Sequence, residues 1–262
     1  MLKGLLLNLQ LFSSIPIRIQ LPMDAHHLQK AVQTFPLLGL FQGLIIGGAF
    51  FGLTEFTPLS ALATAFVVWL LMIVLTGGIH LDGWIDTSDA FFSYQDQDKR
   101  LEIMKDPRTG AFGVLSVIVL LSGKFFFIYE LAAYADINAA AWVVAIIPFL
   151  SKSLMGYYLV TLPPAREEGM ARFFANAVDR KSLWPYLLYT IVIIVASWLF
   201  VEESLLTAVI LLTTSICAGL YGKIKIIKWF GGVTGDVVGA SAEGMEFFLW
   251  MIVWLLHCYV MV

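Results

Sequence analysis

Residues 110–134 read GAFGVLSVIVLLSGKFFFIYELAAY, a stretch in which Lys124 and Glu130 carry the only charges. A helix needs about 20 consecutive apolar residues to cross the roughly 30 Å hydrocarbon core of a bilayer. This stretch meets that requirement, so its natural solvent is lipid. The rest of the chain agrees, because 60% of its 262 residues are hydrophobic and 13% are charged. Such a composition excludes an ordinary soluble protein.

Six more apolar runs lie on either side of this stretch, each bounded by glycine, proline or charged residues that interrupt helices. They cover residues 34–54, 58–77, 137–161, 183–201, 204–222 and 245–262. The sequence therefore predicts an all-α fold, a polytopic membrane bundle of about seven transmembrane helices, as a single domain over residues 1–262. Polar residues interrupt the N-terminal run before a signal-peptide core appears, so we expect that run to be a retained interfacial helix.

Basic residues gather in alternate connections between these runs. The connections near Glu55, Asp136 and Glu202–Glu203 contain none. The other connections hold Lys99, Arg100, Lys105 and Arg108, then Arg166, Arg172, Arg180 and Lys181, then Lys223, Lys225 and Lys228. Cytoplasmic loops collect Lys and Arg, so we expect an odd number of crossings, with the N-terminus cytoplasmic and Val262 outside. The expected active-site loops on the cytoplasmic side are the polar segments at about 78–110, 162–182 and 223–244.

Net charge and the positions of the cysteines argue against a nucleic-acid partner, a disulfide framework and a zinc site. A formal net charge of -3 gives no basic surplus for a nucleic-acid partner. Cys217 and Cys258 lie in apolar runs without a second thiol or histidine at metal-ligand spacing, so neither a disulfide framework nor a zinc site is expected. The expected partners are the bilayer and a small-molecule substrate, and a homo-oligomer is an open alternative.

Three aspartates follow the second apolar run with helical spacing. Asp82, Asp86 and Asp89 are four and then three residues apart, so Asp86 and Asp89 lie about 40° and about 20° to either side of Asp82. Stacked carboxylates repel each other, and such oxygen ligands suit Mg²⁺, which leaves coordination positions open for substrate phosphates. We predict a Mg²⁺ site here. The alternative is a solvated acidic helix end that pairs with Lys99 or Arg100.

The segment from Lys105 to Gly113 offers groups for binding phosphate. Lys105 and Arg108 supply cations, and Gly110 and Gly113 would let backbone amides approach an anion at a helix N-terminus. The same residues also fit an ordinary basic flank of a membrane helix that starts with proline and glycine. Both interpretations remain open at this point.

A glycine-rich segment with acidic groups, residues 231–246, precedes the last run. Gly235 and Gly239 have the spacing that lets membrane helices pack closely, which requires no ligand. Asp236 and Glu243 nevertheless need a cation, a proton or a hydrogen-bond partner if they are buried. We therefore expect this segment to form a second wall of the site.

Other charged residues have less specific surroundings. Arg166 could add a guanidinium to a phosphate site, although a solvated turn explains it equally well. His80 lies beside the aspartates and could donate to an anion or act as a base. Lys124 and Lys152 lie inside apolar runs, where a charge is costly unless paired, so we expect them in salt bridges between helices or in a pocket.

Three motifs in this order resemble the cobalamin synthase family, the adenosylcobinamide-GDP ribazoletransferases. They read GGIHLDGWIDTSD at residues 77–89, IMKDPRTGAFG at 103–113 and GVTGDVVGA at 232–240. The resemblance extends over most of the chain, including FPLLG at residues 35–39 and REEGM at 166–170. Trp84, Ile85 and residues 107–109 depart from what the family is expected to have, but none of these departures changes a carboxylate.

The resemblance implies an enzyme of the prokaryotic inner membrane that condenses adenosylcobinamide-GDP with α-ribazole or its 5′-phosphate. The products would be adenosylcobalamin or its 5′-phosphate, and GMP. The implied catalytic residues are Asp82, Asp86, Asp89, Lys105, Asp106 and Arg108. The first three would hold Mg²⁺, the two basic residues would neutralise phosphoryl charge, and Asp89 or Asp106 would accept the ribazole hydroxyl proton. The implied substrate contacts are His80, Arg166, Thr234, Asp236 and Glu243.

Acidic clusters at helix ends also occur in membrane enzymes that transfer prenyl groups or CDP-linked alcohol phosphates. The CDP-alcohol pattern expects an arginine shortly after Asp82–Gly83, where Ile85 and Asp86 stand. The prenyltransferase pattern expects a second aspartate-rich repeat, which residues 236–246 imitate only loosely. A cation transporter is a third alternative, but its carboxylates would lie near the middle of the bilayer, and no internal repeat is visible.

Overall fold

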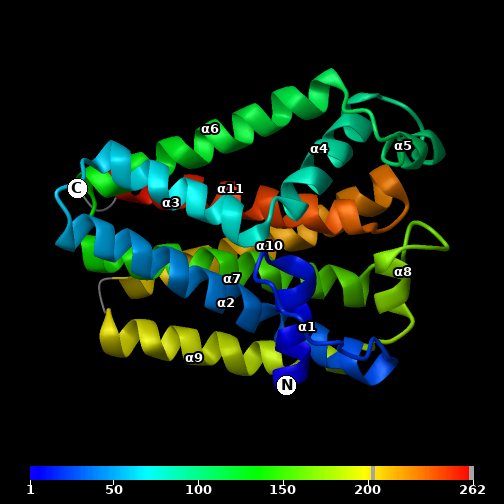
Figure 1. The fold of residues 1–262 in the computed structure, drawn as a ribbon, viewed down its shortest axis with the longest axis horizontal. Helices are drawn as coiled ribbons and strands as arrows, with labels where there is room; N and C mark the ends of the chain where they lie inside the picture. The colour runs from blue at the N-terminus through cyan, green and yellow to red at the C-terminus, as the bar shows by residue number, and fades with distance from the viewer. Residues whose placement is uncertain (202–203, 260–262) are drawn as a thin grey trace.

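The computed structural model describes residues 1–201 and 204–259, and every regular element in these ranges is helical (Figure 1). The helices are α1 (Leu2–Phe12), α2 (Ala25–Phe56), α3 (Ala61–Thr76), α4 (Ile79–Phe92), α5 (Gln97–Ile103), α6 (Ala111–Tyr134), α7 (Ile137–Thr161), α8 (Met170–Ala175), the 3₁₀ helix η1 (Arg180–Leu183), α9 (Trp184–Phe200), α10 (Leu205–Phe230) and α11 (Gly235–Tyr259). The predicted all-α membrane fold is confirmed.

Seven helices run lengthwise through the bundle: α2, α3, α6, α7, α9, α10 and α11 (Figure 1). Six of them are long and apolar enough to cross a membrane alone. The seventh, α3, is followed by α4 after a bend of 86°. The bend occurs at Gly77 and Gly78, whose φ angles of +66° and +75° are left-handed, a conformation that glycine adopts without strain. Helix α3 is thus the candidate for the seventh predicted crossing, and α4 turns away from its direction.

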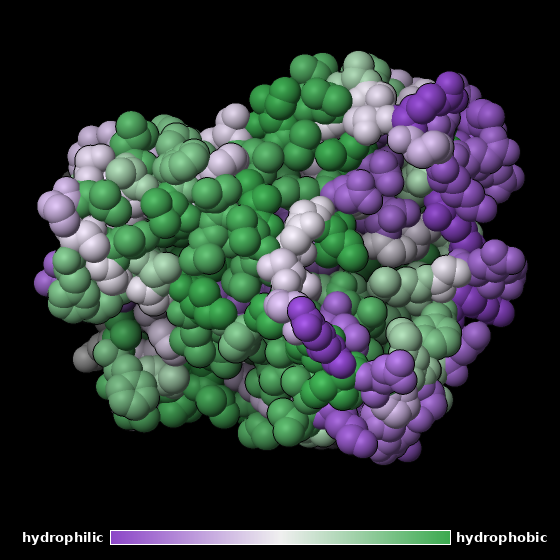
Figure 2. All heavy atoms as spheres, in the orientation of Figure 1, coloured by the Kyte–Doolittle hydropathy of each residue, from purple (hydrophilic) through white to green (hydrophobic). Residues whose placement is uncertain are grey.

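The connections between the helices collect at two ends of the bundle. Short turns at one end join α2 to α3 and α6 to α7, and α11 finishes there (Figure 1). The other end, which we call the polar end, contains residues 93–110, 162–183 and 231–234. Figure 2 shows hydrophilic atoms gathered at this end and mostly hydrophobic atoms over the rest of the same face. Three residues expected at or beyond the opposite end lie outside the described residues: Glu202, Glu203 and Val262.

Several helices extend beyond the predicted apolar runs. Helix α10 continues to Phe230 rather than ending near residue 222, and α11 begins at Gly235 rather than near residue 245. The polar segments at 78–110 and 223–244, which were expected as loops, are therefore mostly helical. The segment at 162–182 includes the short helix α8. The prediction followed hydropathy, which marks only the hydrocarbon layer. A helix continues past that layer, since water and neighbouring helices can satisfy its polar side chains.

Glycines permit close packing between α2 and α7. A Cβ atom on Gly39, Gly43 or Gly47 would collide with the backbone of residues 141–149 of α7. Residues four apart lie on one face of a helix, and small residues on such a face let membrane helices approach each other. These glycines therefore fix the spacing of the two central helices.

The predicted N-terminal helix is α1, which lies across α2 (Figure 1). The buried side chain of Asn8 donates to the carbonyl oxygen of Ala31 at 2.7 Å. Phe12, at the last residue of α1, stacks on His80 of α4 with ring centroids 6.0 Å apart. Helix α1 thereby supports the start of α4, the helix that carries the aspartates.

Candidate active site

Helix α4 lies directly against the start of α11. A Cβ atom on Gly83 would come within 2.7 Å of the carbonyl oxygen of Asp236, so only glycine allows this approach. Asp82 of α4 and Asp236 of α11 line one small cavity, and both act electrostatically on Asp86. We refer to Asp82, Asp86 and Asp236 as the aspartate cluster.

Two backbone hydrogen bonds join the loop after α7 to the loop before α11. The amide of Val233 donates to the carbonyl oxygen of Pro163, and the amide of Ala165 donates to that of Val233, both at 2.9 Å. A Cβ atom on Gly232 would collide with the Pro163 carbonyl group. This pairing holds the next residue, Arg166, beside the start of α11.

Arg166 joins three elements at the polar end. Its Nη1 atom lies 3.6 Å from Oδ2 of Asp236, and its Nη2 atom donates to the carbonyl oxygen of Leu101 in α5 at 2.9 Å. Its Nε atom is buried and has no hydrogen-bond partner in the described part of the chain. The side chain is 20% exposed. The guanidinium therefore retains hydrogen-bonding capacity for an anion.

The aspartate cluster carries more negative charge than its surroundings balance. Asp82 is exposed, whereas Asp86 is half-buried on α4, outside the crossing helices. Burial and the negative charge of Asp82 raise the pKa of Asp86 to about 6. Asp236 and Asp89 add to this shift, while Arg166 opposes it. A cation at this point would relieve the repulsion.

Asp82 and Asp86 fit the ligand requirements of Mg²⁺. Within residues 1–201 and 204–259, no three carboxylate, histidine or cysteine side chains already surround one metal position. Mg²⁺ needs no such cage, because it usually takes one or two carboxylates, several waters and substrate phosphates. Asp82 and Asp86 lie one helical turn apart on α4 and can supply these two carboxylates.

Asp89, the third predicted metal ligand, caps a helix. Its Oδ2 atom accepts from the amide of Gly110 at 2.6 Å, and its Oδ1 atom accepts from the amide of Gly113 at 2.7 Å. These amides belong to the first turn of α6, where backbone donors lack partners within the helix. A Cβ atom on Gly110 would collide with the Asp89 carboxylate. The two glycines predicted to bind an anion thus bind this side chain.

Asp106 and Arg108 pair with each other in the loop before α6. The Nε and Nη2 atoms of Arg108 donate to the two carboxylate oxygens of Asp106 at 2.9 and 2.6 Å. These hydrogen bonds lower the pKa of Asp106 to about 2, so this carboxylate is a weak base. Lys105, which precedes the pair, is exposed at the polar end.

Thr234 and His80 lie beneath the aspartate cluster. The hydroxyl of Thr234 is buried and accepts from the amide of Val237 at 3.1 Å, so it caps the start of α11. His80 is 2% exposed and borders the cavity of about 100 Å³ that Asp82 and Asp236 also line. Its Nε2 atom has no hydrogen-bond partner among the described residues. Both residues support the cluster from inside the bundle.

Comparison with known proteins assigns the family. A model of the family described as cobalamin-5-phosphate synthase matches residues 4–254. The chain belongs to this cobalamin-5-phosphate synthase family. The family predicted from the three motifs is thereby confirmed.

Relatives of similar length carry the name adenosylcobinamide-GDP ribazoletransferase. The relative from Geobacillus sp. (strain WCH70) is 38% identical over 260 residues, which cover 99% of this chain and 98% of the relative. The relative from Acinetobacter baumannii (strain ACICU) is 35% identical over 90% of each chain. The relative from Clostridioides difficile (strain 630) is 30% identical over 100% of this chain and 98% of its own. No solved structure matches the chain.

Glu243 lies inside the bundle of this cobalamin-5-phosphate synthase family member and not on the expected substrate wall. Its carboxylate contacts the ammonium of Lys124 at 2.5 Å. Glu246 contacts Lys124 and Lys152, both at 3.0 Å, and accepts from the hydroxyl of Ser151. All four charged side chains are at most 7% exposed. The expected salt bridges of Lys124 and Lys152 are confirmed, and we call these four residues the buried network.

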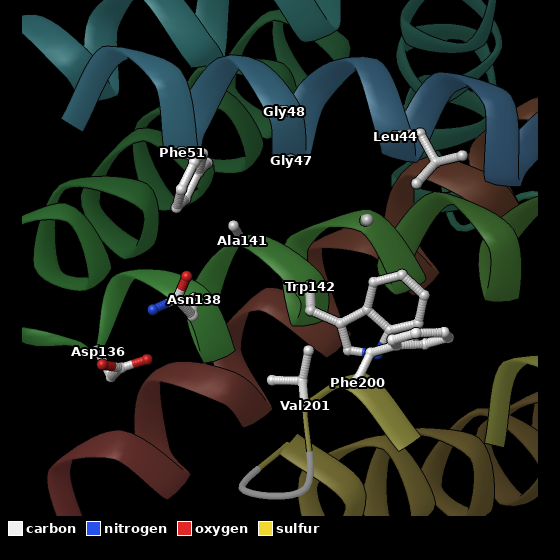
Figure 3. Close-up of a pocket in the computed structure, with 11 residues that line it drawn as sticks. Leu44, Gly47, Gly48, Phe51, Asp136, Asn138, Ala141, Trp142, Phe200 and Val201 are labelled. Carbon is white, nitrogen blue, oxygen red and sulfur yellow. The ribbon is translucent and has the colours of Figure 1, made fainter. Parts of the chain in front are cut away.

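A larger cavity, of about 800 Å³, lies at the end of the bundle opposite the motifs of the family. Figure 3 shows its walls, with Phe51 from α2, Trp142 from α7 and Phe200 from α9. Its carboxylate, Asp136, accepts from the amide of Ala139 and caps α7. Since the family motifs lie at the polar end, we assign no chemistry to this cavity.

Sequence reasoning identified the members of the site separately but missed what brings them together. Gly83 and Gly232 let the segments of the site approach each other closely, but the sequence showed each only as part of a motif. Phe12, which stacks on His80, gave no signal beyond its place at the end of an apolar run. Gly83 could have been recognised as a packing position, because a glycine inside a helical pattern often has a packing reason.

Proposed function

We propose that this protein transfers the adenosylcobinamide phosphoryl group from adenosylcobinamide-GDP to α-ribazole or α-ribazole 5′-phosphate. The product would be adenosylcobalamin or its 5′-phosphate, with release of GMP. The observation that carries this proposal is the aspartate cluster facing Arg166 at the polar end. The name adenosylcobinamide-GDP ribazoletransferase, carried by relatives that are up to 39% identical over nearly the full chain, supports the proposal.

The reaction requires charge neutralisation more than covalent chemistry by the protein. A hydroxyl oxygen of the ribazole attacks phosphorus, the bond to the GMP oxygen breaks, and the hydroxyl proton leaves. Phosphoryl transfer of this kind depends on positioning and on stabilising charge on the phosphate oxygens. Mg²⁺ bound by Asp82 and Asp86 would supply part of that stabilisation.

Basic side chains would hold the phosphates against the aspartate cluster. Arg166 is only loosely paired with Asp236, at 3.6 Å, and its planar guanidinium suits a phosphate. Lys105 and Arg108 lie in the exposed loop before α6. They would neutralise the departing GMP, with Arg108 exchanging its partner Asp106 for phosphate.

Asp236 is the best placed carboxylate to accept the hydroxyl proton. Asp89 was one of the expected bases, but both of its oxygens accept from the amides that begin α6. Asp106 was the other, and its pKa of about 2 makes it a poor proton acceptor. Asp236 is half-buried on the wall that faces Asp86. Proton transfer to Asp236 would also release Arg166 toward the phosphates.

The protein would work in the prokaryotic inner membrane with its polar end in the cytoplasm. Lysine and arginine residues are abundant in the connections of the polar end. The positive-inside rule favours the cytoplasmic side for such connections. Adenosylcobinamide-GDP and the ribazole would then reach the aspartate cluster from the cytoplasm.

Release of GMP by purified protein in lipid vesicles tests the proposal. Adenosylcobinamide-GDP would be offered with α-ribazole or with its 5′-phosphate, after EDTA treatment and again after addition of Mg²⁺. We expect GMP and the joined corrinoid to appear only with Mg²⁺. Full turnover in EDTA would refute the metal requirement, and absence of turnover with either acceptor would refute the transferase. Uptake of Mg²⁺ into sealed vesicles without turnover would favour the transporter.

A further inference from the structure

A second cavity, of about 610 Å³, lies between α10 and α11 and reaches α4 and α7. We call it the lipid-side groove. Its walls are mostly apolar, and they include Trp84 and Thr87 of α4, Tyr221 and Lys225 of α10, and Val237 and Phe248 of α11. Among the described residues that line it, none is an aspartate of the proposed active site.

The groove is long and follows the helix axes. On α11 its wall extends from Val237 to Phe248, and on α10 from Thr214 to Phe230. At 1.5 Å per residue the α11 wall is about 16 Å long. Because these helices cross the membrane, the long dimension of the groove is parallel to lipid chains. An acyl chain fits this shape.

The groove opens toward the hydrocarbon of the bilayer. Tyr221, which lines the groove, is 61% exposed, and Ile224 on the outer face of α10 is 66% exposed. The proposed active site lies on another face of α4, since Trp84 projects about 160° away from Asp86. Gly83 packs against the backbone of Asp236 and closes the space between them. The groove is therefore separate from the phosphate site.

A positive charge stands at the polar end of the groove. The ammonium of Lys225 lies 4.9 Å from the ring centroid of Tyr221 and 5.6 Å from that of Trp229. Among the described residues, no carboxylate forms an ion pair with Lys225. Lys228 follows on the next turn of the same helix, but it is exposed and does not line the groove. Basic residues in such a position between membrane helices attract anionic headgroups.

Two buried polar atoms in the walls also have no partner. The indole nitrogen of Trp84 and the hydroxyl of Thr87 make no hydrogen bond within residues 1–201 and 204–259. Both side chains line the groove. A purely hydrocarbon occupant would leave both unsatisfied, which is costly. The ester oxygens of a phospholipid, which lie just below its phosphate, would satisfy them.

We propose that the lipid-side groove binds one anionic phospholipid. Its acyl chain lies along α10 and α11, its ester oxygens accept from Trp84 and Thr87, and its phosphate contacts Lys225. The bound lipid packs against the side of α4 that points away from Asp86 and so supports the helix that carries the aspartates. This inference stands without the proposed reaction, because it concerns lipid binding alone.

Lipid retention by the purified protein tests this inference. Protein would be transferred from vesicles of phosphatidylglycerol or phosphatidylcholine into detergent, and bound phospholipid would be counted by native mass spectrometry. We expect the wild type to retain one phosphatidylglycerol and little phosphatidylcholine. Lys225→Gln should weaken retention by about fivefold, the effect of one lysine near an anionic headgroup. Ala218→Phe, which fills the groove, should abolish retention.

Two matched variants separate the groove from the general surface. Lys228→Gln removes a neighbouring charge on α10, and Ile216→Phe adds a ring at a position that is 53% exposed and outside the groove. Both should retain the lipid as the wild type does, and all four variants should unfold at similar temperatures. Equal retention of the two lipids, or equal loss in Lys225→Gln and Lys228→Gln, would overturn the proposal. Displacement of the lipid by a corrinoid would overturn it as well.

Discussion

The aspartate cluster and the buried network use similar residues in opposite ways. In the buried network, two glutamates face two lysines, and the formal charges cancel. In the aspartate cluster, three carboxylates face the single guanidinium of Arg166. The two groups meet on one helix, because α11 carries Asp236 as well as Glu243 and Glu246. The balance of charge around an acid therefore separates structural residues from functional ones here.

The difference follows from the cost of burying charge. A charged side chain deep in a membrane bundle must be paired and hydrogen-bonded, or it destabilises the fold. At the polar end, water reaches Asp82, so an excess of negative charge is tolerated there. Such an excess remains available to a cation and a phosphate. The following variants test whether the two groups differ in this way, from the largest expected effect to the smallest.

Asp86→Asn should abolish turnover without unfolding the protein. The amide cannot replace a carboxylate on Mg²⁺, so we expect GMP release to fall by about 1,000-fold. The temperature of thermal unfolding should be unchanged or slightly higher, because the variant removes repulsion within the aspartate cluster. Glu102→Gln is the matched control, since Glu102 is exposed and pairs with Lys99. Turnover of Asp86→Asn near that of the control would contradict the assignment of Asp86.

Glu246→Gln, unlike Asp86→Asn, should cause a large loss of stability. It leaves the ammonium of Lys152 buried without the carboxylate that lies 3.0 Å away. We expect the free energy of unfolding to fall by about 3 kcal/mol, measured by denaturant titration in mild detergent. Replacing Lys152 and Glu246 together by methionine should recover most of this loss, because Lys124 keeps Glu243. A double variant as unstable as the single one would show that charge pairing is not the cause.

Asp89→Ala should reduce stability rather than metal binding. The substitution leaves the amides of Gly110 and Gly113 without their acceptor, which costs about 1 kcal/mol for a helix cap. The Mg²⁺ concentration needed for half-maximal GMP release should stay close to that of the wild type. If that concentration instead rises as steeply as for Asp82→Asn, Asp89 is a metal ligand, as the sequence alone suggested.

The pH dependence of stability should reveal Asp86 in metal-free protein. Its pKa of about 6 lies above the ordinary value of 3.8, so the folded protein binds more protons than the unfolded chain between about pH 4 and about pH 6. Stability should therefore fall as pH rises through this window in EDTA. The fall should be smaller in Asp86→Asn, and Mg²⁺ should reduce it in the wild type, as measured by thermal unfolding. A fall of equal size in wild type and variant would assign it to another group.

Much of the membrane fold could be predicted from the sequence. The seven apolar runs correspond to the seven lengthwise helices, because the width of the hydrocarbon layer sets a minimum length that is visible in composition. The helical spacing of Asp82 and Asp86 was also recovered, since α4 is a helix. What composition could not predict was the 86° bend before α4. Adjacent glycines permit a bend, but packing against α6 and α11 sets its angle.

The sequence predicted which residues lie at the candidate site better than it predicted what each of them does there. Asp89 shares the spacing of the other aspartates, yet its oxygens bind amides at the start of α6 that lie 21 and 24 residues later in the chain. Arg108 and Asp106, which were expected to act on substrate, pair with each other. Such partners lie far apart in sequence or depend on loop conformation. Spacing along one helix therefore could not reveal them.

The sequence alone determined which segments lie in lipid and which lie in water. It also determined that the acidic and basic motifs lie together at one end of the bundle, the polar end. Those properties depend on local composition, because lipid excludes unpaired charge from any apolar run. Only the tertiary structure decided which acids stay available for a ligand. Asp236 and Glu243 lie about two turns apart on one face of α11, so the local pattern cannot distinguish them. Arg166 approaches one and Lys124 the other, from segments distant in the chain, and those contacts set the charge balance of each acid.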